Sequence, residues 1–298
     1  MAVDFTPSNV TLSEQPDGTI PNDYNTLIMG DIIENSRVMQ LGVFEQMDSQ
    51  EEEFQYFANG IGAYWVDEGE KIQTTKPTML QVTMKAKKLG VILVASREYL
   101  KYQMPDFFEK MRPKIAEAFY KKFDEAVILG EDNPFVQSIE GSIATTGKIV
   151  EGDINYENIL ELEDVLFADD VDPNAFISKT QNSTALRQTS ITSNGVVQSM
   201  YDRPTNTIDG MPTVNLQSSL FPKGRLYAGD FDTLRYGIPF NISYRVSEDA
   251  QLSTVTNADG SPVNLYEQEL IAIRATMDVG MMIVKDEAFA KIEPAPAV

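Results

Sequence analysis

The most restrictive feature of the chain is the block of residues 63–130, where strand patterns lead directly into one long helical pattern. From Leu80 to Lys87, apolar and polar residues alternate with the two-residue period of a strand that has one face in water. Residues 89–95 (LGVILVA) are almost all apolar and predict a strand that is covered on both faces. Together with residues 63–77 they indicate a long two-stranded arm. Such an arm needs a partner surface, because it is marginally stable alone in water.

A long helix is predicted over residues 105–129. Apolar residues recur there at steps of three and four and form one stripe, which is typical of a helix packed on one side: Phe108, Met111, Ile115, Phe119, Phe123 and Ala126. Gly130 follows as a natural C-terminal cap. Pro113 interrupts the pattern, because proline removes a backbone hydrogen bond and clashes with the preceding turn. The sequence leaves two alternatives, a kink at Pro113 or a main helix that begins there.

Composition narrows the possible chemistry. The formal net charge is −21, and the chain has no Cys and no His, which excludes disulfides, thiolate nucleophiles, the usual zinc ligands and Ser-His-Asp catalysis. So negative a chain repels phosphate backbones and is a poor general nucleic-acid binder. Residues 61–130 hold 12 of the 24 Lys and Arg, whereas residues 1–60 hold one basic and 11 acidic side chains. This asymmetry predicts electrostatic pairing of the two regions, within one chain or between chains.

The sequence also indicates how the N-terminal residues behave and in which compartment the protein is found. Residues 1–30 are punctuated by prolines and lack a lasting period, so they are interpreted either as a disordered tail or as an arm that orders on a neighbouring subunit. No secretory signal and no apolar run of membrane-spanning length is visible. We therefore expect a protein that is made and kept in the cytoplasm and has no membrane partner.

Shorter elements are predicted elsewhere. Residues 24–41 have the apolar spacing of a short helix, and another helix follows Asn155 as its cap. Residues 175–178 fit a short buried strand, and residues 265–292 return to strands. The turn-rich residues 131–150 mark a domain boundary.

Several side chains invite a chemical interpretation, and each also has a plainer one. The pair Asp230 and Asp232, with Asp169 and Asp170, has the chemistry of a cation site, but acids in turns more often cap the turn or face water. A Ser-Lys nucleophile would draw on Ser36, Ser96 and Lys88, and nothing in their spacing supports it. A hydrolase would use paired carboxylates, either Glu68 with Glu70 or Asp169 with Asp170. Trp65 is interpreted as an interface anchor rather than a core residue.

Three stretches, in order, resemble the HK97-like major capsid proteins of tailed bacteriophages. The first is AYWVDEGEKI with KPTMLQVTMKAKKLGVILVASREYL and the helix ending AFYKKFDEAVILG, similar to the extended loop and spine helix of that family. The second is ILELEDVLFADDVDPNAFISKTQNSTALRQT, similar to the helix, strand and helix of the apical domain. The third is TIDGMPTVNLQSSLFPKGRLYAGDFDTLRYGI, where Gly210, Pro212, Gly229, Asp230 and Phe231 match the family pattern.

The resemblance implies an α+β capsid subunit with an N-terminal arm, an extended β-hairpin loop, a long spine helix, and peripheral and apical domains. The expected boundaries are 1–60 for the arm and short helix, and 61–96 for the extended loop. The peripheral domain is expected at 97–150 plus 262–298, with the spine helix at 105–129, and the apical domain at 151–261.

The resemblance also implies a function. The chain is expected to self-assemble as hexamers and pentamers of an icosahedral virion shell that encloses double-stranded DNA without sequence-specific binding. Expected partners are a portal and a separate scaffolding protein, with assembly in the host cytoplasm, and no enzyme activity or cofactor is expected. An encapsulin-like protein compartment shares the fold and is the alternative. Inter-subunit contacts are expected from the loop and the start of the helix: Trp65, Asp67, Glu68, Glu70, Lys71, Lys76, Lys85, Lys87, Lys88, Arg97 and Arg112.

Overall fold

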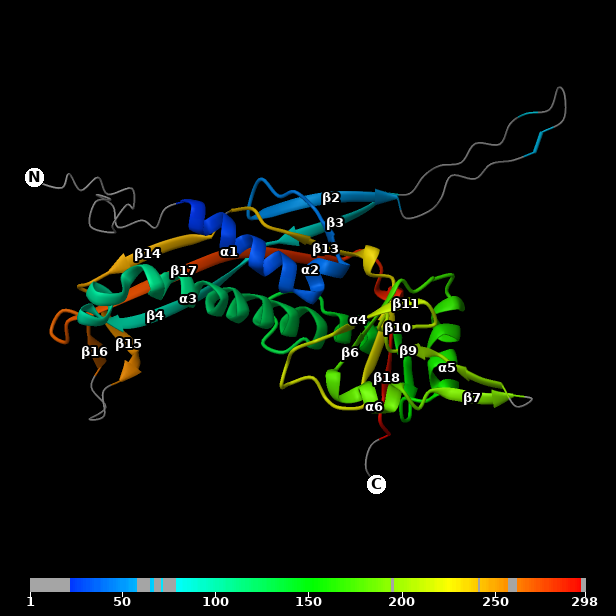
Figure 1. Cartoon of the computed structure of the whole chain (residues 1–298). Helices are drawn as coiled ribbons and strands as arrows, with labels where there is room; N and C mark the ends of the chain where they lie inside the picture. Colours follow the sequence, from blue (N-terminus) through cyan, green and yellow to red (C-terminus); the bar gives the residue numbers. More distant parts are fainter. Residues whose placement is uncertain are drawn as a thin grey trace, which may run out of the picture.

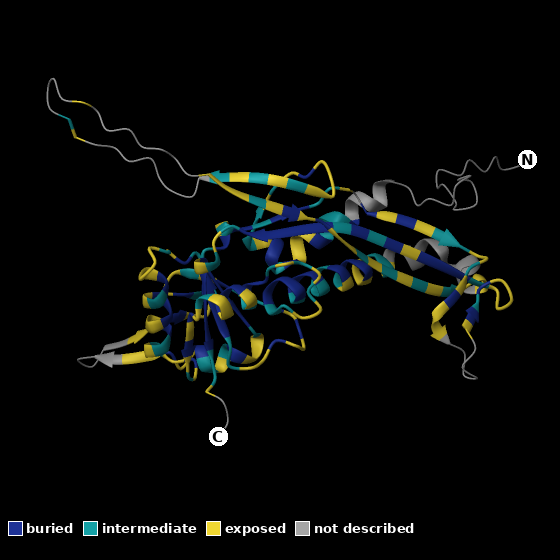
Figure 2. Cartoon of the chain, turned by 180° about the vertical axis from the view of Figure 1, so that it is seen from behind, coloured by how far each residue is buried: buried dark blue, intermediate teal, exposed yellow. Residues whose placement is uncertain are grey.

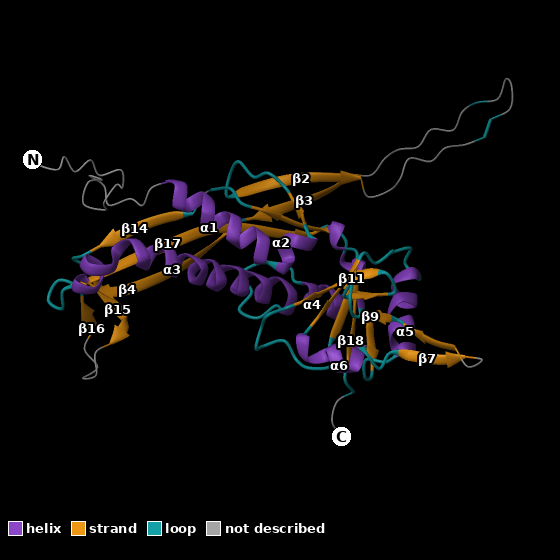
Figure 3. Ribbon diagram, viewed as in Figure 1, coloured by secondary structure: helices purple, strands orange, loops and turns teal. Residues whose placement is uncertain are grey.

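The computed structural model describes residues 22–57, 65–66, 71, 79–193, 196–240, 242–256 and 262–295. Two bodies, each built around one β-sheet, lie at the two ends of an elongated molecule (Figure 1). Helix α3 (Arg97–Asp124) runs along the first body and points toward the second. Secondary structure is mixed in both bodies, as Figure 3 shows, so the predicted α+β class is confirmed.

The first body is a five-stranded sheet built on β17 (Leu270–Ile283). One side of β17 pairs antiparallel with β4 (Lys87–Ser96) from residue 270 to residue 279. Its other side pairs with β14 (Ser243–Ser247) and then with β13 (Leu234–Gly237), and β1 (Val43–Phe44) follows β13 in parallel.

Three helices cover one face of this sheet: α1 (Asn22–Asn35), α2 (Arg37–Leu41) and α3. Alternate residues of β17, from Ile273 to Ile283, share one hydrophobic core with Ile115, Phe119 and Phe123 of α3. The other face carries the remaining alternate residues of β17 and no helix of the described chain. On this other face Met282 packs in a small core with Met47 and Met84, and Ala272 packs in another with Leu252 and Val263.

The second body is a seven-stranded sheet in the order β5-β18-β12-β6-β11-β10-β9. Its strands are β5 (Ile149–Glu151), β18 (Phe289–Glu293), β12 (Leu226–Gly229), β6 (Ala175–Ser178), β11 (Met211–Asn215), β10 (Thr207–Ile208) and β9 (Tyr201–Asp202). Helix α5 (Tyr156–Phe167) buries Ile159, Leu162 and Leu166 against a separate core, and α4 (Ile139–Thr146) joins this body to the first.

Three two-stranded ribbons project from the bodies. They are β2 (Glu51–Phe57) with β3 (Met79–Lys85), β15 (Gln251–Thr256) with β16 (Pro262–Asn264), and β7 (Ser190–Ser193) with β8 (Val196–Ser199). The remaining elements are short: α6 (Ser183–Leu186), three 3-10 turns at Thr180–Asn182, Phe231–Thr233 and Asp286–Ala288, and the π-helical turn Glu125–Leu129.

Most predicted elements are confirmed, and the long helix is longer than predicted. Ile115, Phe119, Phe123 and Ala126 are buried, and Gly130 caps the helix with φ 72°. The predicted start at residue 105 is wrong, because α3 begins at Arg97 and is helical on both sides of Pro113. Pro113 is exposed, so water can satisfy the carbonyl that its missing N–H leaves free.

Strand pairing corrects three predicted boundaries. The extended strand pair was expected within 61–96, but its first strand is β2, and β4 belongs to the five-stranded sheet. The predicted apical range 151–261 includes β13 and β14, which pair with β17 in the first body. The predicted peripheral range 262–298 includes β18, which lies in the middle of the other sheet. Sequence order misled here, because strands far apart in the chain are neighbours in both sheets.

Burial corrects the interpretation of residues 89–95. They were predicted to be covered on both faces, yet burial alternates along β4. Leu89, Val91 and Leu93 pack on the helices, whereas Ile92 and Val94 remain 48% and 37% exposed. One apolar face of β4 is therefore not covered by the residues that the structure describes.

Gly229 shows why the GDF segment requires glycine. A Cβ atom at this position would lie 2.5 Å from the Ala288 carbonyl oxygen and 3.2 Å from the Phe289 Cα atom. Because backbone atoms cannot move aside cheaply, we expect Gly229→Ala to lower the free energy of unfolding by about 1–3 kcal/mol. Gly30→Ala is the matched control, since no atom lies within 4 Å of its Cβ position. Equal stability of the two variants in denaturant unfolding would contradict this explanation.

Candidate assembly surfaces

The outer part of the strand pair holds the most exposed predicted contact residues. Trp65 and Lys71 are both exposed, and Trp65 is 105% exposed relative to its reference value. The other four predicted contacts of this stretch lie outside the described residues: Asp67, Glu68, Glu70 and Lys76. At the root of the pair, Met84 packs with Met47, Ala86 and Met282 in a small core of its own. The ribbon is thus packed along one face, through Phe54, Tyr56 and Val82, and exposed along the other.

Three of the predicted contacts have acidic partners within the chain. Lys85 pairs with Glu51 across β2 and β3 at 2.8 Å, with both side chains more than half exposed. Arg97 pairs with Glu248 at 3.3 Å. Exposed pairs of this kind contribute little to stability, so both cations stay accessible to another molecule.

Arg112 forms its ion pair within its own chain and stabilises the fold there. Its guanidinium group holds both carboxylate oxygens of Asp31, with N–O distances of 2.7 and 2.8 Å, and ties α1 to α3. This two-bond geometry is the stronger kind of ion pair. Sequence reasoning did not identify Asp31 as its partner, because the two residues lie far apart in the chain.

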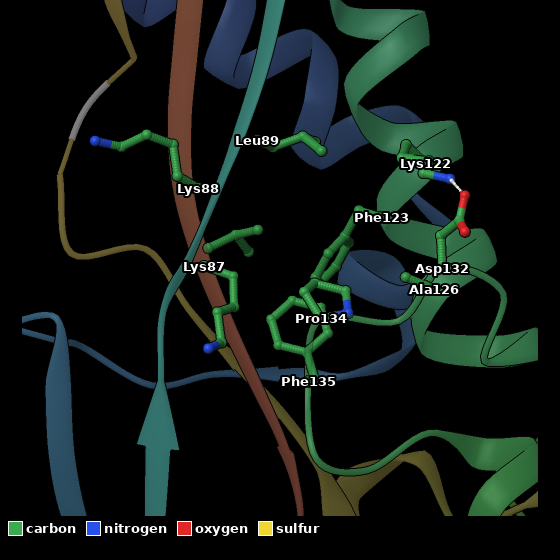
Figure 4. A pocket seen from close by; sticks show the side chains of 10 residues that line it. Lys87, Lys88, Leu89, Lys122, Phe123, Ala126, Asp132, Pro134 and Phe135 are labelled. Carbon is green, nitrogen blue, oxygen red and sulfur yellow. Dashed lines mark hydrogen bonds and ion pairs between the residues drawn. The ribbon is translucent and has the colours of Figure 1, made fainter.

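Lys87 and Lys88 lie at the rim of an apolar pocket of about 220 Å³. Figure 4 shows this pocket between β4, the end of α3 and the loop at residues 132–135. Its apolar lining includes Leu89, Phe123, Phe135 and Val279. On the helix side, Lys122 forms an ion pair with Asp132 at 2.7 Å. Neither Lys87 nor Lys88 has an ion-pair partner in the described part of the chain.

A buried carboxylate, missed from the sequence, joins the spine helix to α2. Asp124 of α3 accepts hydrogen bonds from the Ser36 hydroxyl at 2.6 Å and from the backbone N–H groups of Arg37 and Val38 at 2.8 and 3.2 Å. Ser36 in turn caps α2 by accepting from Met39. Burial raises the pKa of Asp124 to about 6, although the three hydrogen bonds act in the opposite direction.

A second buried polar cluster joins α4 to the seven-stranded sheet. Glu140 accepts from the Tyr227 hydroxyl at 2.7 Å and from Lys291 at 2.6 Å. Lys291 also pairs with Glu293 at 2.6 Å, and Arg225 contacts both carboxylates. Burial, followed by the charge of Glu140, raises the pKa of Tyr227 and keeps its hydroxyl a hydrogen-bond donor. Two cations and two anions thus neutralise each other at the joint between the bodies.

Glu163 of α5 is buried, and its Oε1 atom has no hydrogen-bond partner among the described residues. Burial, and then the carboxylate of Asp209, raise its pKa from 4.5 to about 7. The folded protein therefore keeps a proton that the unfolded chain loses, and stability falls as pH rises from about 4.5 to about 7. We expect Glu163→Gln to remove this part of the pH dependence in denaturant unfolding. Glu161→Gln, exposed on the same helix, should leave it, and unchanged slopes in both variants would refute this assignment.

Three of the residues considered for chemistry, Asp230, Asp169 and Ser36, have structural roles. Asp230 accepts from the Asp232 N–H and from the Asn174 side chain, and so caps the turn after β12. Asp169 pairs with the buried Lys148 at 2.6 Å. Ser36 is occupied with Asp124. Within the described residues, no group of three or more Asp or Glu side chains is arranged to hold a metal ion. Nor is any described helix both long enough and apolar enough to cross a membrane.

Comparison with known proteins places this arrangement in a family. The Phage capsid family matches residues 17–293, nearly the whole chain. The chain belongs to this family, and its role is that of a major capsid protein of a tailed phage. This membership confirms the predicted resemblance and favours a virion component over the protein compartment.

Individual relatives and solved structures support this family membership. The major capsid protein of Staphylococcus phage 80alpha is 51% identical over 292 residues, covering 98% of this chain and 90% of the relative. Among solved structures, one from Microbacterium phage Oxtober96 superposes with a TM-score of 0.68 at 18% identity, covering 99% and 96% of the two chains. A structure titled as the capsid of an empty GTA particle with C5 symmetry has a TM-score of 0.63 at 15% identity, covering 88% and 90%. The predicted fold is thereby confirmed.

Proposed function

We propose that this capsid protein forms hexamers and pentamers of an icosahedral shell by laying its β2–β3 ribbon on neighbouring subunits. The observation that carries the proposal is the ribbon itself. One face of the ribbon packs on its own chain through Phe54, Tyr56, Val82 and Met84, while Met79 and Leu80 at its outer end are 57% and 41% exposed. A two-stranded ribbon with exposed apolar side chains is stable only when another surface covers it.

The finer features of the shell are inferred from charge and family. The net charge of −21 suits a container for double-stranded DNA, because a basic wall would bind the DNA through counterion release. A portal and a separate scaffolding protein would complete assembly in the host cytoplasm. The five-stranded body is assigned as the peripheral domain and the seven-stranded body as the apical domain. Membership of the capsid family implies a structural role for this protein.

Electron microscopy of the purified protein, expressed alone and with its neighbouring genes, tests the proposal. Closed angular shells are the expected result, with a requirement for another gene product identifying a scaffold. A monodisperse monomer under every condition would overturn the proposal.

Charge reversal tests the basic surface of the subunit. We expect Lys87→Glu with Lys88→Glu to impair shell assembly several-fold without unfolding the monomer, because neither lysine has an ion-pair partner in the described chain. Lys223→Glu is the matched control, since it reverses an exposed lysine of the other body. Assembly is measured by sedimentation and folding by circular dichroism. Normal shells from the double variant would show that this basic surface makes no essential contact.

A further inference from the structure

The buried face of α5 contains one acidic residue. Figure 2 shows that buried residues fill the interior of the seven-stranded body, while exposed residues lie on its outer side. The buried residues of α5 occupy positions i, i+3, i+4 and i+7 of one helix face: Ile159, Leu162, Glu163 and Leu166. Glu163 is therefore on the side of α5 that packs on the core, and it is only 4% exposed. A carboxylate in such a place is costly unless a partner neutralises it.

A tight hairpin turn packs against the same core. Ile208 of β10 and Met211 of β11 lie opposite each other in the hairpin, and both contact the core that α5 covers. Asp209 and Gly210 connect them with left-handed φ angles of 46° and 81°, which is the geometry of a two-residue hairpin loop. Asp209 is thus fixed beside a residue that packs on α5, and its own side chain is exposed.

The carboxylates of Glu163 and Asp209 repel each other, and no cation of the described chain compensates them. Burial, and then the negative charge of Asp209, raise the pKa of Glu163, so the two groups lie within electrostatic range of each other. Glu163 Oε1 is buried and has no hydrogen-bond partner among the described residues. No Lys or Arg in the described ranges forms an ion pair with Glu163 or Asp209. The pair therefore lacks the positive partner that buried carboxylates normally have.

The surrounding sequence adds negative charge and no positive charge. Residues 149–178, which include α5, contain nine acidic side chains and no Lys or Arg. A region of one sign of charge raises the local concentration of counter-ions. Carboxylate oxygens are the preferred ligands of hard divalent cations. The chemistry around Glu163 and Asp209 therefore favours a divalent cation as the missing positive partner.

We propose that Glu163 and Asp209 bind a divalent cation, Ca²⁺ by preference, between α5 and the hairpin turn. Ca²⁺ accepts about six to eight oxygen ligands in a flexible geometry, whereas Mg²⁺ demands a near-ideal octahedron. Water reaches the site through the exposed Asp209 and supplies the ligands that the two carboxylates do not. Because the protein provides few ligands, the dissociation constant is expected to be on the order of 1 mM. The bound ion would join α5 to the β10–β11 hairpin and end the repulsion between the two carboxylates.

Thermal unfolding of the full-length chain, freed of metal with EDTA, tests the proposal. We expect CaCl2 at about ten times the dissociation constant to raise the melting temperature by about 2–5 °C, compared with NaCl of the same ionic strength. Glu163→Gln and Asp209→Asn should each remove this rise, and asparagine tolerates the positive φ at residue 209. Glu161→Gln is the matched control, since it removes an exposed carboxylate from the same helix and should keep the rise.

Equilibrium dialysis with radioactive calcium distinguishes a specific site from general attraction to an acidic protein. The unmodified chain and Glu161→Gln should each bind an additional ion that Glu163→Gln and Asp209→Asn do not. Equal binding by all four proteins, or an equal rise in melting temperature, would overturn the site and attribute the calcium effect to the acidic surface as a whole. Loss of binding in only one of the two site variants would overturn the bridging of two carboxylates. Because the site lies within one chain, none of these results bears on shell formation.

Discussion

Replacing Asp124 with alanine is expected to lower the free energy of unfolding by about 3–5 kcal/mol, because three donors, two of them buried and one partly buried, then lose their acceptor. The Ser36 hydroxyl and the N–H groups of Arg37 and Val38 all point at this carboxylate. Asp124 is 1% exposed, so water cannot replace it without opening the contact between α2 and α3. Urea unfolding at neutral pH measures the loss.

The control for Asp124 is the exposed carboxylate near the end of the same helix. Asp132→Asn removes the charge of the surface pair with Lys122 and keeps a side chain that tolerates the backbone φ of 47° at this position, so its effect should be within about 1 kcal/mol. Comparable losses in the two variants would contradict the proposed role of Asp124.

Asp124 also predicts a pH dependence of definite sign. Its folded pKa of about 6 lies above the ordinary value of 3.8, so the folded state holds its proton more tightly. The contribution of Asp124 to stability should therefore be fully present below its ordinary pKa of 3.8 and fall as pH rises through this interval, by up to about 1.4 kcal/mol per pH unit. Asp124→Asn should flatten this slope. A wild-type slope that persists in the Asn variant would assign the effect to another group.

Replacing Glu140 with alanine is expected to lower the free energy of unfolding by about 3–5 kcal/mol. The buried Lys291 then loses one of its two carboxylate partners and keeps only Glu293. Lys291 is 4% exposed, and the Tyr227 hydroxyl loses its acceptor at the same time. The loss should appear in thermal and denaturant unfolding of the monomer, since the cluster joins α4 to the seven-stranded sheet.

Two comparisons make the Glu140 experiment specific. Glu151→Ala removes an exposed carboxylate from the edge strand β5 and should have little effect. A combined Glu140→Leu and Lys291→Met change removes an anion and a cation together, and should cost less than Glu140→Ala alone. If the double variant is the less stable of the two, the cluster contributes through packing rather than charge balance.

The sequence predicted local elements well where one repeating pattern dominates. The stripe through Ile115, Phe119 and Phe123 identified the spine helix, because a single face of that helix is buried. Its start at Arg97 was missed, although Leu100 and Met104 continue the stripe at steps of four before Phe108. The run at residues 89–95 was misread because an uncovered apolar face and a covered one have the same composition.

Long-range organisation was predicted less well. No local pattern indicates that β18 lies between β5 and β12, or that Arg112 reaches Asp31. The uneven distribution of acidic and basic residues along the chain predicted a basic surface for association. It did not predict that Lys87 and Lys88 lie beside an apolar pocket. The burial of Asp124 was not predicted, because an acidic residue on a helix with a single apolar stripe is ordinarily expected to face water.

The central placement of β18 has a consequence for biosynthesis. Residues 289–293 supply a strand with neighbours on both sides, so the seven-stranded sheet cannot close until these residues have left the ribosome. Domains whose strands come from distant parts of a chain fold late during synthesis. Nascent and prematurely terminated chains thus lack one finished body. Only chains that contain residues 289–293 can therefore complete the seven-stranded sheet and enter the growing particle in a fully folded state.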